Sequence, residues 1–379
     1  MIKYTTLGDV ITPAKVVRCG NGVFSVLSMT MHDGIVLQSE RFKKNLASLD
    51  QADYKVVKRG QLVVGFPIDE GVLYVQKAAE EGIMSPAYNV WDINTEIIDT
   101  DFLELSLHSP QSMQYYKNKL RGTTARRRSI PTSDLLALKI PLPDLQTQRE
   151  TVAIIKKANK IISLRQQQLS KLDELVKSRF VEMFGDPITG REYSRHQISE
   201  LGVVGTGNTP SMRVPEYYCS KDIPFVKPGD MTENGVTIVD NSKTAFISEY
   251  ARKAARIIPR NTVMVTCIGT IGKIGIVQRE SACNQQINYI IPKKSVNSVY
   301  LAHCLCFCKP ALEEMANAPV VPIINKTQFS SVVLPVPPVE YQNRFAAFVA
   351  EVDKSKLAVQ KGLQELEILK KSLMQQYFG

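Results

Sequence analysis

Three short stretches of the 379-residue chain carry residue types that could perform chemistry, and each lacks a residue that the chemistry needs. The stretch from Gly269 to Lys273 is similar in composition to a phosphate-binding loop. Such a loop has four residues between its glycines and a Ser or Thr after its lysine. Here two residues separate Gly269 from Gly272, and Ile274 follows the lysine. We therefore expect a glycine-rich turn between strands.

The second stretch, His303 to Cys308, contains one histidine and three cysteines, which are residue types that bind zinc. It lies in an apolar run that predicts a helix, where these side chains point to different faces, so we expect them in a core. The third, Val336 to Val339, lacks the polar and aromatic residues that flank the Pro-Pro pair of amino-methyltransferases. We predict no catalytic residue, metal site or cofactor in this chain. An enzyme with a divergent active site would need a convergent cluster that the sequence does not show.

The composition favours a polyanionic partner. The chain has 47 Lys and Arg against 37 Asp and Glu, a formal charge of +10. With 44% apolar and 22% charged residues it is typical of a globular protein of more than one domain. No run predicts a signal peptide or a membrane span, and seven cysteines without regular spacing indicate a reducing cytoplasm.

The sequence contains a long repeat. Residues 140–185 align without a gap with residues 334–379, at an offset of 194. The copies share a Pro-x-Pro start, one glutamine and a Phe-Gly end, namely Pro141, Pro143, Gln148 and Phe184-Gly185 with Pro335, Pro337, Gln342 and Phe378-Gly379. A repeat of this length indicates one structural unit that is present twice.

Each copy predicts a long helix, because no Pro or Gly interrupts the first before Gly185 and only Gly362 lies inside the second. Apolar residues recur on a heptad seam that is typical of a coiled coil. The other copy is the expected partner, since an exposed apolar stripe is costly. The residues expected at the helix–helix contact are Ile155, Ile162, Leu169, Leu172, Val176, Val352, Val359, Leu363, Leu366 and Leu373.

Two modules precede these helices and show the same order of strand and turn signals. The predicted segments are module 1 (1–139), a central helix (140–187), module 2 (188–333) and a distal helix (334–379). The Asp33-Gly34 turn of module 1 corresponds to Asn234-Gly235, and Ile130 to Thr132 corresponds to Ile323 to Asn325. We predict an α+β protein with two mixed α/β modules joined by two long antiparallel coiled-coil helices in a pseudo-two-fold repeat.

This order resembles the specificity subunit of Type I restriction-modification systems. Module 2 carries that family's phrases in sequence, at Ile223 to Met231, Gly269 to Gly275, Asn284 to Asn288 and Leu334 to Gln342. Module 1 departs from the pattern. Val26 to Gly34 occupies the place of the first motif with a different sequence, and module 1 has no recognisable counterpart of Gly269 to Lys273.

The resemblance implies that the modules are target recognition domains, each reading one half of a bipartite site in duplex DNA. It implies that the helices hold the modules apart and dock two methyltransferase subunits, and that restriction and motor subunits join the assembly. S-adenosylmethionine, and ATP with Mg²⁺, are then implied for the partner subunits and not for this chain.

The candidate DNA contacts are basic, hydroxyl and amide residues on turns. Cations suit phosphates, and Gln285 and Gln286 suit adenine edges. In module 1 they are Arg41, Lys43, Lys44, Arg126, Arg127 and Arg128. In module 2 they are Thr209, Ser211, Arg213, Lys227, Thr270, Lys273, Gln285, Gln286, Asn325 and Lys326. The favoured function is a non-catalytic DNA-reading subunit; the alternative is a scaffold whose helices organise a complex without reading DNA.

Overall fold

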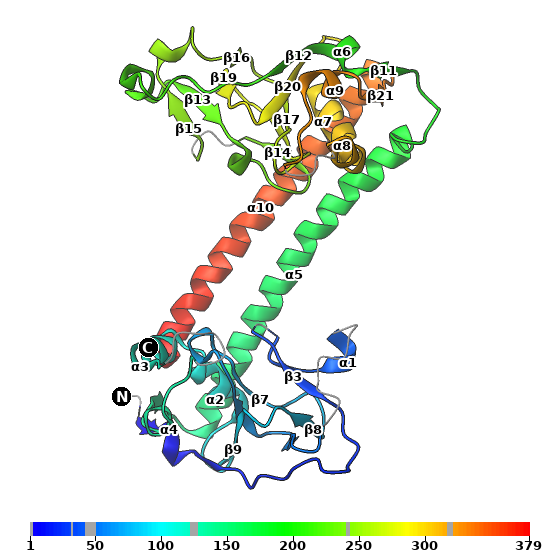
Figure 1. The fold of residues 1–379 in the computed structure, drawn as a ribbon. Coiled ribbons are helices and arrows are strands. Elements are labelled where there is room, and N and C mark those ends of the chain that lie inside the picture. Colours follow the sequence, from blue (N-terminus) through cyan, green and yellow to red (C-terminus); the bar gives the residue numbers. More distant parts are fainter. Residues whose placement is uncertain (1–2, 32, 42–50, 122–127, 240–242, 317–320) are drawn as a thin grey trace. The chain divides into compact units, whose positions relative to one another are not determined.

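The computed structural model describes residues 3–31, 33–41, 51–121, 128–239, 243–316 and 321–379 (Figure 1). The chain divides into two compact units. Unit 1 comprises Met1–Arg165 with Lys361–Gly379, and unit 2 comprises Gln166–Gln360. Each unit therefore contains one module and one half of each long helix, and the divisions fall inside the helices.

The two long helices are present as predicted, and each is continuous over 40 residues: α5 (Leu145–Phe184) and α10 (Val339–Phe378) (Figure 1). At about 1.5 Å per residue, each is about 60 Å long. Asp144 caps the start of α5, where its carboxylate accepts from the backbone N–H of Thr147 at 2.9 Å. Gly185 ends the helix with φ +71°, and its N–H donates to the Val181 carbonyl at 2.8 Å.

Unit 1 is built on a four-stranded antiparallel sheet in the order β2-β9-β6-β7. The strands of this module are β1 (Tyr4–Thr6), β2 (Ile11–Pro13), β3 (Leu27–Met29), β4 (Ile35–Leu37), β5 (Lys55–Lys58), β6 (Leu62–Val64), β7 (Leu73–Val75), β8 (Glu81–Met84), β9 (Asn89–Ile93) and β10 (Lys139–Pro141). Its helices are α1 (Gln38–Arg41), α2 (Thr100–Leu107), α3 (Pro110–Lys119) and α4 (Thr132–Leu136), with 3₁₀ turns η1 (Leu7–Asp9) and η2 (Ile68–Glu70).

Unit 2 repeats this plan with one more strand, in the order β12-β20-β17-β18-β14. Its strands are β11 (Arg195–Gln197), β12 (Gly202–Thr206), β13 (Ile223–Val226), β14 (Val236–Ile238), β15 (Ala245–Ile247), β16 (Ile257–Ile258), β17 (Val263–Thr266), β18 (Ile274–Ile276), β19 (Ser281–Cys283), β20 (Ile287–Pro292) and β21 (Val333–Pro335). Its helices are α6 (Ile198–Leu201), α7 (Ser298–Phe307), α8 (Lys309–Met315) and α9 (Lys326–Ser330), with 3₁₀ turns η4 (Pro215–Tyr218), η5 (Pro228–Asp230) and η6 (Glu249–Ala251).

The repeat extends to strand pairing in the smaller sheets. β1 pairs with β10 in unit 1 as β11 pairs with β21 in unit 2, antiparallel in both. The order β15-β13-β19-β16 corresponds to the two pairs β4-β3 and β8-β5, which a parallel bridge between Val26 and Ile83 connects. The two modules therefore share one topology although their sequences differ.

The glycine-rich loop of module 2 has a counterpart that the sequence did not reveal. In unit 2 the loop from β17 to β18 ends with Gly272 at φ +77°. In unit 1 the loop from β6 to β7 ends with Gly71 at φ +79°. A left-handed glycine before the returning strand is thus the feature that both loops keep. The residues before it differ, since Phe66 to Glu70 replace the Gly-Thr-Ile run.

Each unit buries its own part of the two long helices. In unit 1, Ile155 of α5 shares a core with Phe378 of α10, whose ring lies 5.0 Å from Phe102. In unit 2, the ring centroid of Phe180 in α5 lies 5.3 Å from that of Phe345 in α10. The beginning of α5 therefore packs with the end of α10 and the reverse, which makes the helices antiparallel.

The ten predicted helix-packing residues are all buried or half-buried, with Ile155, Val176, Val352 and Val359 fully buried. Two polar residues that interrupt the seam also have partners. The Lys356 ammonium lies 2.6 Å from the Asp173 carboxylate, which joins α10 to α5 within unit 2. The Arg179 guanidinium lies over the Phe348 ring at 5.8 Å. Both of these charges therefore have a partner on the opposite helix.

Candidate nucleic-acid interface

A tight turn between β19 and β20 forms the centre of one edge of module 2. Buried Asn284 folds this turn, because its side-chain oxygen accepts from the Gln286 N–H at 3.1 Å and its amide donates to the Gln286 side-chain oxygen at 2.9 Å. Its own N–H donates to the Val226 carbonyl at 3.2 Å, at the end of β13. Gln285 is exposed at the tip of the turn and Gln286 is half-buried.

The segment after β12 lies against this turn. Backbone N–H groups of Gly207 and Asn208 donate to the carbonyls of Ile287 and Cys283, each at 2.9 Å. A Cβ atom at Gly207 would lie 2.3 Å from backbone oxygens, so only glycine permits this approach. The Thr209 hydroxyl then donates to the Gln285 side-chain oxygen at 2.7 Å. Two predicted contact residues, Thr209 and Gln285, therefore meet, and one orients the amide of the other.

Arg256 belongs to the same edge, and sequence reasoning missed it. Its N–H donates to the Asn208 side chain at 2.7 Å, and its guanidinium donates to the Thr206 carbonyl. The residue is exposed. It lies in a basic segment with Arg252, Lys253 and Arg260, but the sequence pattern assigned it to the start of a strand and not to a contact loop. A long-range backbone contact brings its charge to the edge.

Lys227 and Asn325 also reach this edge by backbone pairing. Lys227 directly follows the Val226 carbonyl that the turn contacts; it is exposed, and its ammonium lies 5.9 Å from the Phe225 ring. Asn325 follows Ile324, whose carbonyl accepts from the Asn288 side chain at 2.9 Å. The Asn325 side chain is the N-cap of α9 and accepts from the Gln328 N–H at 2.9 Å. Helix capping therefore accounts for this asparagine, and its DNA contact stays a prediction.

The remaining candidates of module 2 differ in exposure. Thr270, Arg213, Ser211 and Lys326 are exposed. Lys273 is different, because only 14% of its side chain is exposed. Its ammonium lies 3.9 Å from the carboxylate of Glu233, in the loop between η5 and β14. We therefore expect Lys273 to be a weaker phosphate ligand than Lys227.

In module 1 the described candidates are engaged with carboxylates. Arg41 forms an ion pair with Asp33. Arg128 pairs with Asp69, at 2.7 Å, and with Glu70, which together raise the pKa of its guanidinium. Lys43, Lys44, Arg126 and Arg127 lie outside the described residues. Their contact with DNA stays a prediction.

The equivalent turn of module 1 presents different groups. It runs Ser85-Pro86-Ala87, and the Tyr88 N–H donates to the Ser85 carbonyl at 3.2 Å, as the Ile287 N–H does to Asn284 in module 2. Beside it lies a cavity of about 370 Å³ lined in part by Ala87, Asn89, Ser129 and Thr132. Two modules of one topology thus carry unlike chemical groups at equivalent turns.

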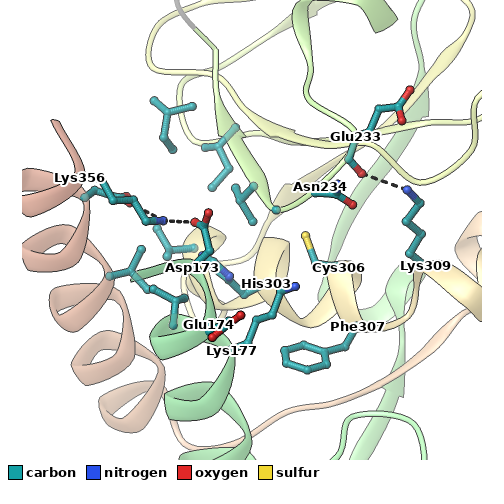
Figure 2. Close-up of a pocket in the computed structure, with 18 of the residues that line it drawn as sticks. Asp173, Glu174, Lys177, Glu233, Asn234, His303, Cys306, Phe307, Lys309 and Lys356 are labelled. Atoms are coloured by element: carbon teal, nitrogen blue, oxygen red, sulfur yellow. Dashed lines mark hydrogen bonds and ion pairs between the residues drawn. The ribbon is translucent and has the colours of Figure 1, made fainter. Parts of the chain in front are cut away.

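A larger cavity of about 810 Å³ lies inside unit 2, between module 2 and the adjoining parts of α5 and α10 (Figure 2). Its charges are largely paired: Lys356 with Asp173 at 2.6 Å, and the Lys309 ammonium with the Glu233 carbonyl at 3.0 Å. Burial, with the nearby Lys356 charge, lowers the pKa of His303 to about 4, so this imidazole is neutral. Among the described residues, no three His, Cys, Asp or Glu side chains are arranged to hold a metal ion.

Comparison with known proteins supports the family resemblance. Residues 191–368, which cover module 2 and most of α10, match the family described as Type I restriction modification DNA specificity domain. Residues 191–368 therefore carry a Type I restriction modification DNA specificity domain, and the chain is similar to specificity subunits of Type I restriction-modification systems. Both the resemblance drawn from the sequence phrases and the predicted fold class are confirmed.

The relatives in this family are distant and cover much of the chain. The HindI specificity subunit of Haemophilus influenzae is 22% identical over 369 residues, which span 77% of this chain and 80% of the relative. The EcoR124I/EcoR124II specificity subunit of Escherichia coli is 24% identical over 278 residues, 68% of this chain and 67% of the relative.

Two solved structures share the fold over nearly the whole chain. One, from work on complex assembly and conformational transition of the type I R-M system, has a TM-score of 0.64 at 18% identity and covers 99% of this chain and 97% of that one. The other, a Type I S subunit from M. genitalium, has a TM-score of 0.56 at 14% identity and covers 100% and 96%. Within the described residues, no helix is long and apolar enough to cross a membrane.

Proposed function

We propose that this chain reads a bipartite, asymmetric site in duplex DNA, one half with each module, and performs no chemistry itself. The observation that supports this most is the pair of equivalent turns. Asn284 to Gln286 presents an oriented amide, whereas Ser85 to Ala87 presents a hydroxyl, a proline and a methyl group. One backbone topology that displays unlike groups is suited to two unlike half-sites.

In module 2 the edge supplies both kinds of contact that DNA recognition needs. Lys227 and Arg256 are exposed cations for phosphates, which fix register without reading sequence. Gln285 is exposed, and its amide can form two hydrogen bonds with an adenine edge in the major groove. Thr209 orients that amide through a bond of 2.7 Å. The groups gathered here bind and select; they do not form an acid–base pair.

The long helices fix the gap between the half-sites in this proposal. Each runs without interruption from one unit into the other, and each is 40 residues long. A continuous helix changes its length only by whole residues, about 1.5 Å each. The number of helical residues between the modules then sets the length of DNA between the half-sites.

The catalytic partners follow from the family. We propose that two methyltransferase subunits and the restriction and motor subunits dock on this chain, and that S-adenosylmethionine, and ATP with Mg²⁺, are bound by those partners. The role of this chain is to bring the methyltransferase to the chosen base, which that partner extracts from the duplex.

The test is to co-express the chain with the methyltransferase subunit of the same system and to sequence the methylated positions in exposed DNA. A split motif with one fixed gap is the expected result. Purified complex should also bind that duplex with an affinity that falls steeply as salt rises. A complex that forms but methylates and binds without a split motif would refute DNA reading by the modules and favour the scaffold function.

A further inference from the structure

One buried glutamine stands at the start of each long helix. Gln148 is the fourth residue of α5 and Gln342 the fourth residue of α10, and both side chains are 0% exposed. A buried amide needs partners for its donors and its acceptor, because an unpaired polar group inside a protein is destabilising. The partners of these two side chains show what the glutamines do.

Gln148 joins three segments of unit 1. Its Nε2 donates to the carbonyl of Pro143, in the lead-in to α5, at 2.8 Å, and to the carbonyl of Ile97 at 3.0 Å. Its Oε1 accepts from the N–H of Asp99 at 2.7 Å. The lead-in to the helix is thus tied to the loop that follows β9, the last strand of the sheet before α2.

Gln342 makes the same three bonds in unit 2. Its Nε2 donates to the carbonyl of Pro337, in the lead-in to α10, at 2.7 Å, and to that of Ser295 at 3.4 Å. Its Oε1 accepts from the N–H of Asn297 at 2.8 Å. The two glutamines are in equivalent places and use equivalent backbone groups.

The accepted N–H comes in both units from the residue that caps a module helix. Asp99 is the N-cap of α2, and its carboxylate accepts from the Phe102 N–H at 3.0 Å. Asn297 is the N-cap of α7, and its side chain accepts from the Val299 N–H at 2.9 Å. One amide therefore connects the first turn of the long helix to the first turn of the packed module helix. Three directed bonds in a dry site define one angle between the two helices, which apolar contacts alone do not do.

We propose that Gln148 and Gln342 are positioning residues that fix the direction of each module on its long helix, and that they thereby make recognition selective for one gap length. This inference rests on the proposed function, since a gap has meaning only for a bipartite site. The glutamines contact no DNA in this scheme; they act through the helix junction.

The test uses Gln342→Met and Gln148→Met in the complex of the chain with its methyltransferase subunit. Methionine keeps the side-chain length and leaves the three backbone partners unpaired. The matched control is Gln364→Met, because Gln364 is exposed on α10. Each complex selects duplexes from a pool in which both half-sites and the gap length vary. The selected molecules are sequenced, and affinities for the original gap and for gaps one base pair longer or shorter are compared.

Wild type and the Gln364→Met control should discriminate between gap lengths and keep the same half-sites. Each glutamine variant should lose about tenfold of this discrimination, because the three bonds that fix the junction are absent, and should also keep the half-sites. Equal weakening on all gaps, or unchanged discrimination, would overturn the inference. If a methionine variant does not fold, Gln342→Asn, which shortens the reach by one methylene, gives the same comparison. A wild-type complex with no gap preference would instead refute the proposed function.

Discussion

Removing seven residues from each long helix should shorten the recognised gap without changing the half-sites. The segments to delete are 163–169 of α5 and 358–364 of α10, which contain the divisions between the two units. The segments contain no member of the two module cores, but they remove Leu169, Val359 and Leu363 from the helix–helix contact. Because the deletion is one heptad, Ile162 is followed by Val176 at the correct seam position, and Val352 by Leu366.

The size of the effect follows from helix geometry. Seven residues at about 1.5 Å remove about 10 Å, which equals about 3 base pairs of duplex at a 3.4 Å rise. They also remove nearly two whole turns, so the two ends rotate by only about 20° relative to each other. The modules should therefore select half-sites that are about 3 base pairs nearer. Because 3 base pairs turn the duplex by about 100° at 10–10.5 base pairs per turn, binding to the shorter gap should be weaker than wild-type binding to the original gap.

The assay is the selection of duplexes with variable half-sites and gaps, read by sequencing. The control keeps the helix length and replaces the exposed residues Ser163, Leu164 and Gln167 by alanine, which should leave the gap unchanged. A deletion variant that folds and still selects the original gap would show that the helices do not set the spacing.

Three further predictions concern module 2. Burial lowers the pKa of His303 to about 4, so the folded state disfavours protonation, and this contribution to stability is present above pH 6.5 and lost as pH falls from 6.5 to 4. His303→Phe should remove about 3 kcal/mol of this pH dependence in urea unfolding, and an unchanged slope would contradict it. Asn325→Ala should cost about 1 kcal/mol of unfolding free energy through the lost cap of α9 and leave base preference unchanged, which separates capping from DNA contact. Lys227→Ala should weaken binding to all DNA sequences and reduce the slope of log affinity against log salt concentration by about 1. Gln285→Ala should cost about 1–3 kcal/mol of binding free energy through one base pair only. Equal losses of affinity on every sequence for both variants would refute the assigned roles.

The long helices could be predicted because their signals are local and occur twice. Absence of Pro and Gly, a heptad of apolar residues and a capped start act within one segment, so the helices and their packed faces agree with the pattern. The polar interruption at Lys356 could not be understood from the sequence, since its partner, Asp173, is on the other helix. The repeat of the modules was visible in the order of turns, but Gly71 was not recognised as the counterpart of Gly272. The two loops share a backbone conformation and little else.

The candidate interface was harder to predict because residue type does not show what a side chain already binds. Thr209 and Gln285 are 76 residues apart and meet through strand pairing. Arg256 reaches the same edge by a backbone contact that no spacing predicts. Conversely, Arg128 is part of a basic run in the sequence, yet two carboxylates from a distant turn hold its guanidinium. Charge on a loop indicates a partner only after the intramolecular partners are known.

The division of the chain inside the helices has a consequence for the exchange of modules between related proteins. Cutting where module 2 meets the two helices, near residues 187 and 333, would separate Tyr300 from Phe184 and Phe345, whose rings pack in one cluster. Cutting at mid-helix would transfer residues 166–360 with that cluster whole. Under the proposed function, hybrids joined at the helix midpoints should fold and should take their new half-site together with the intact ring cluster.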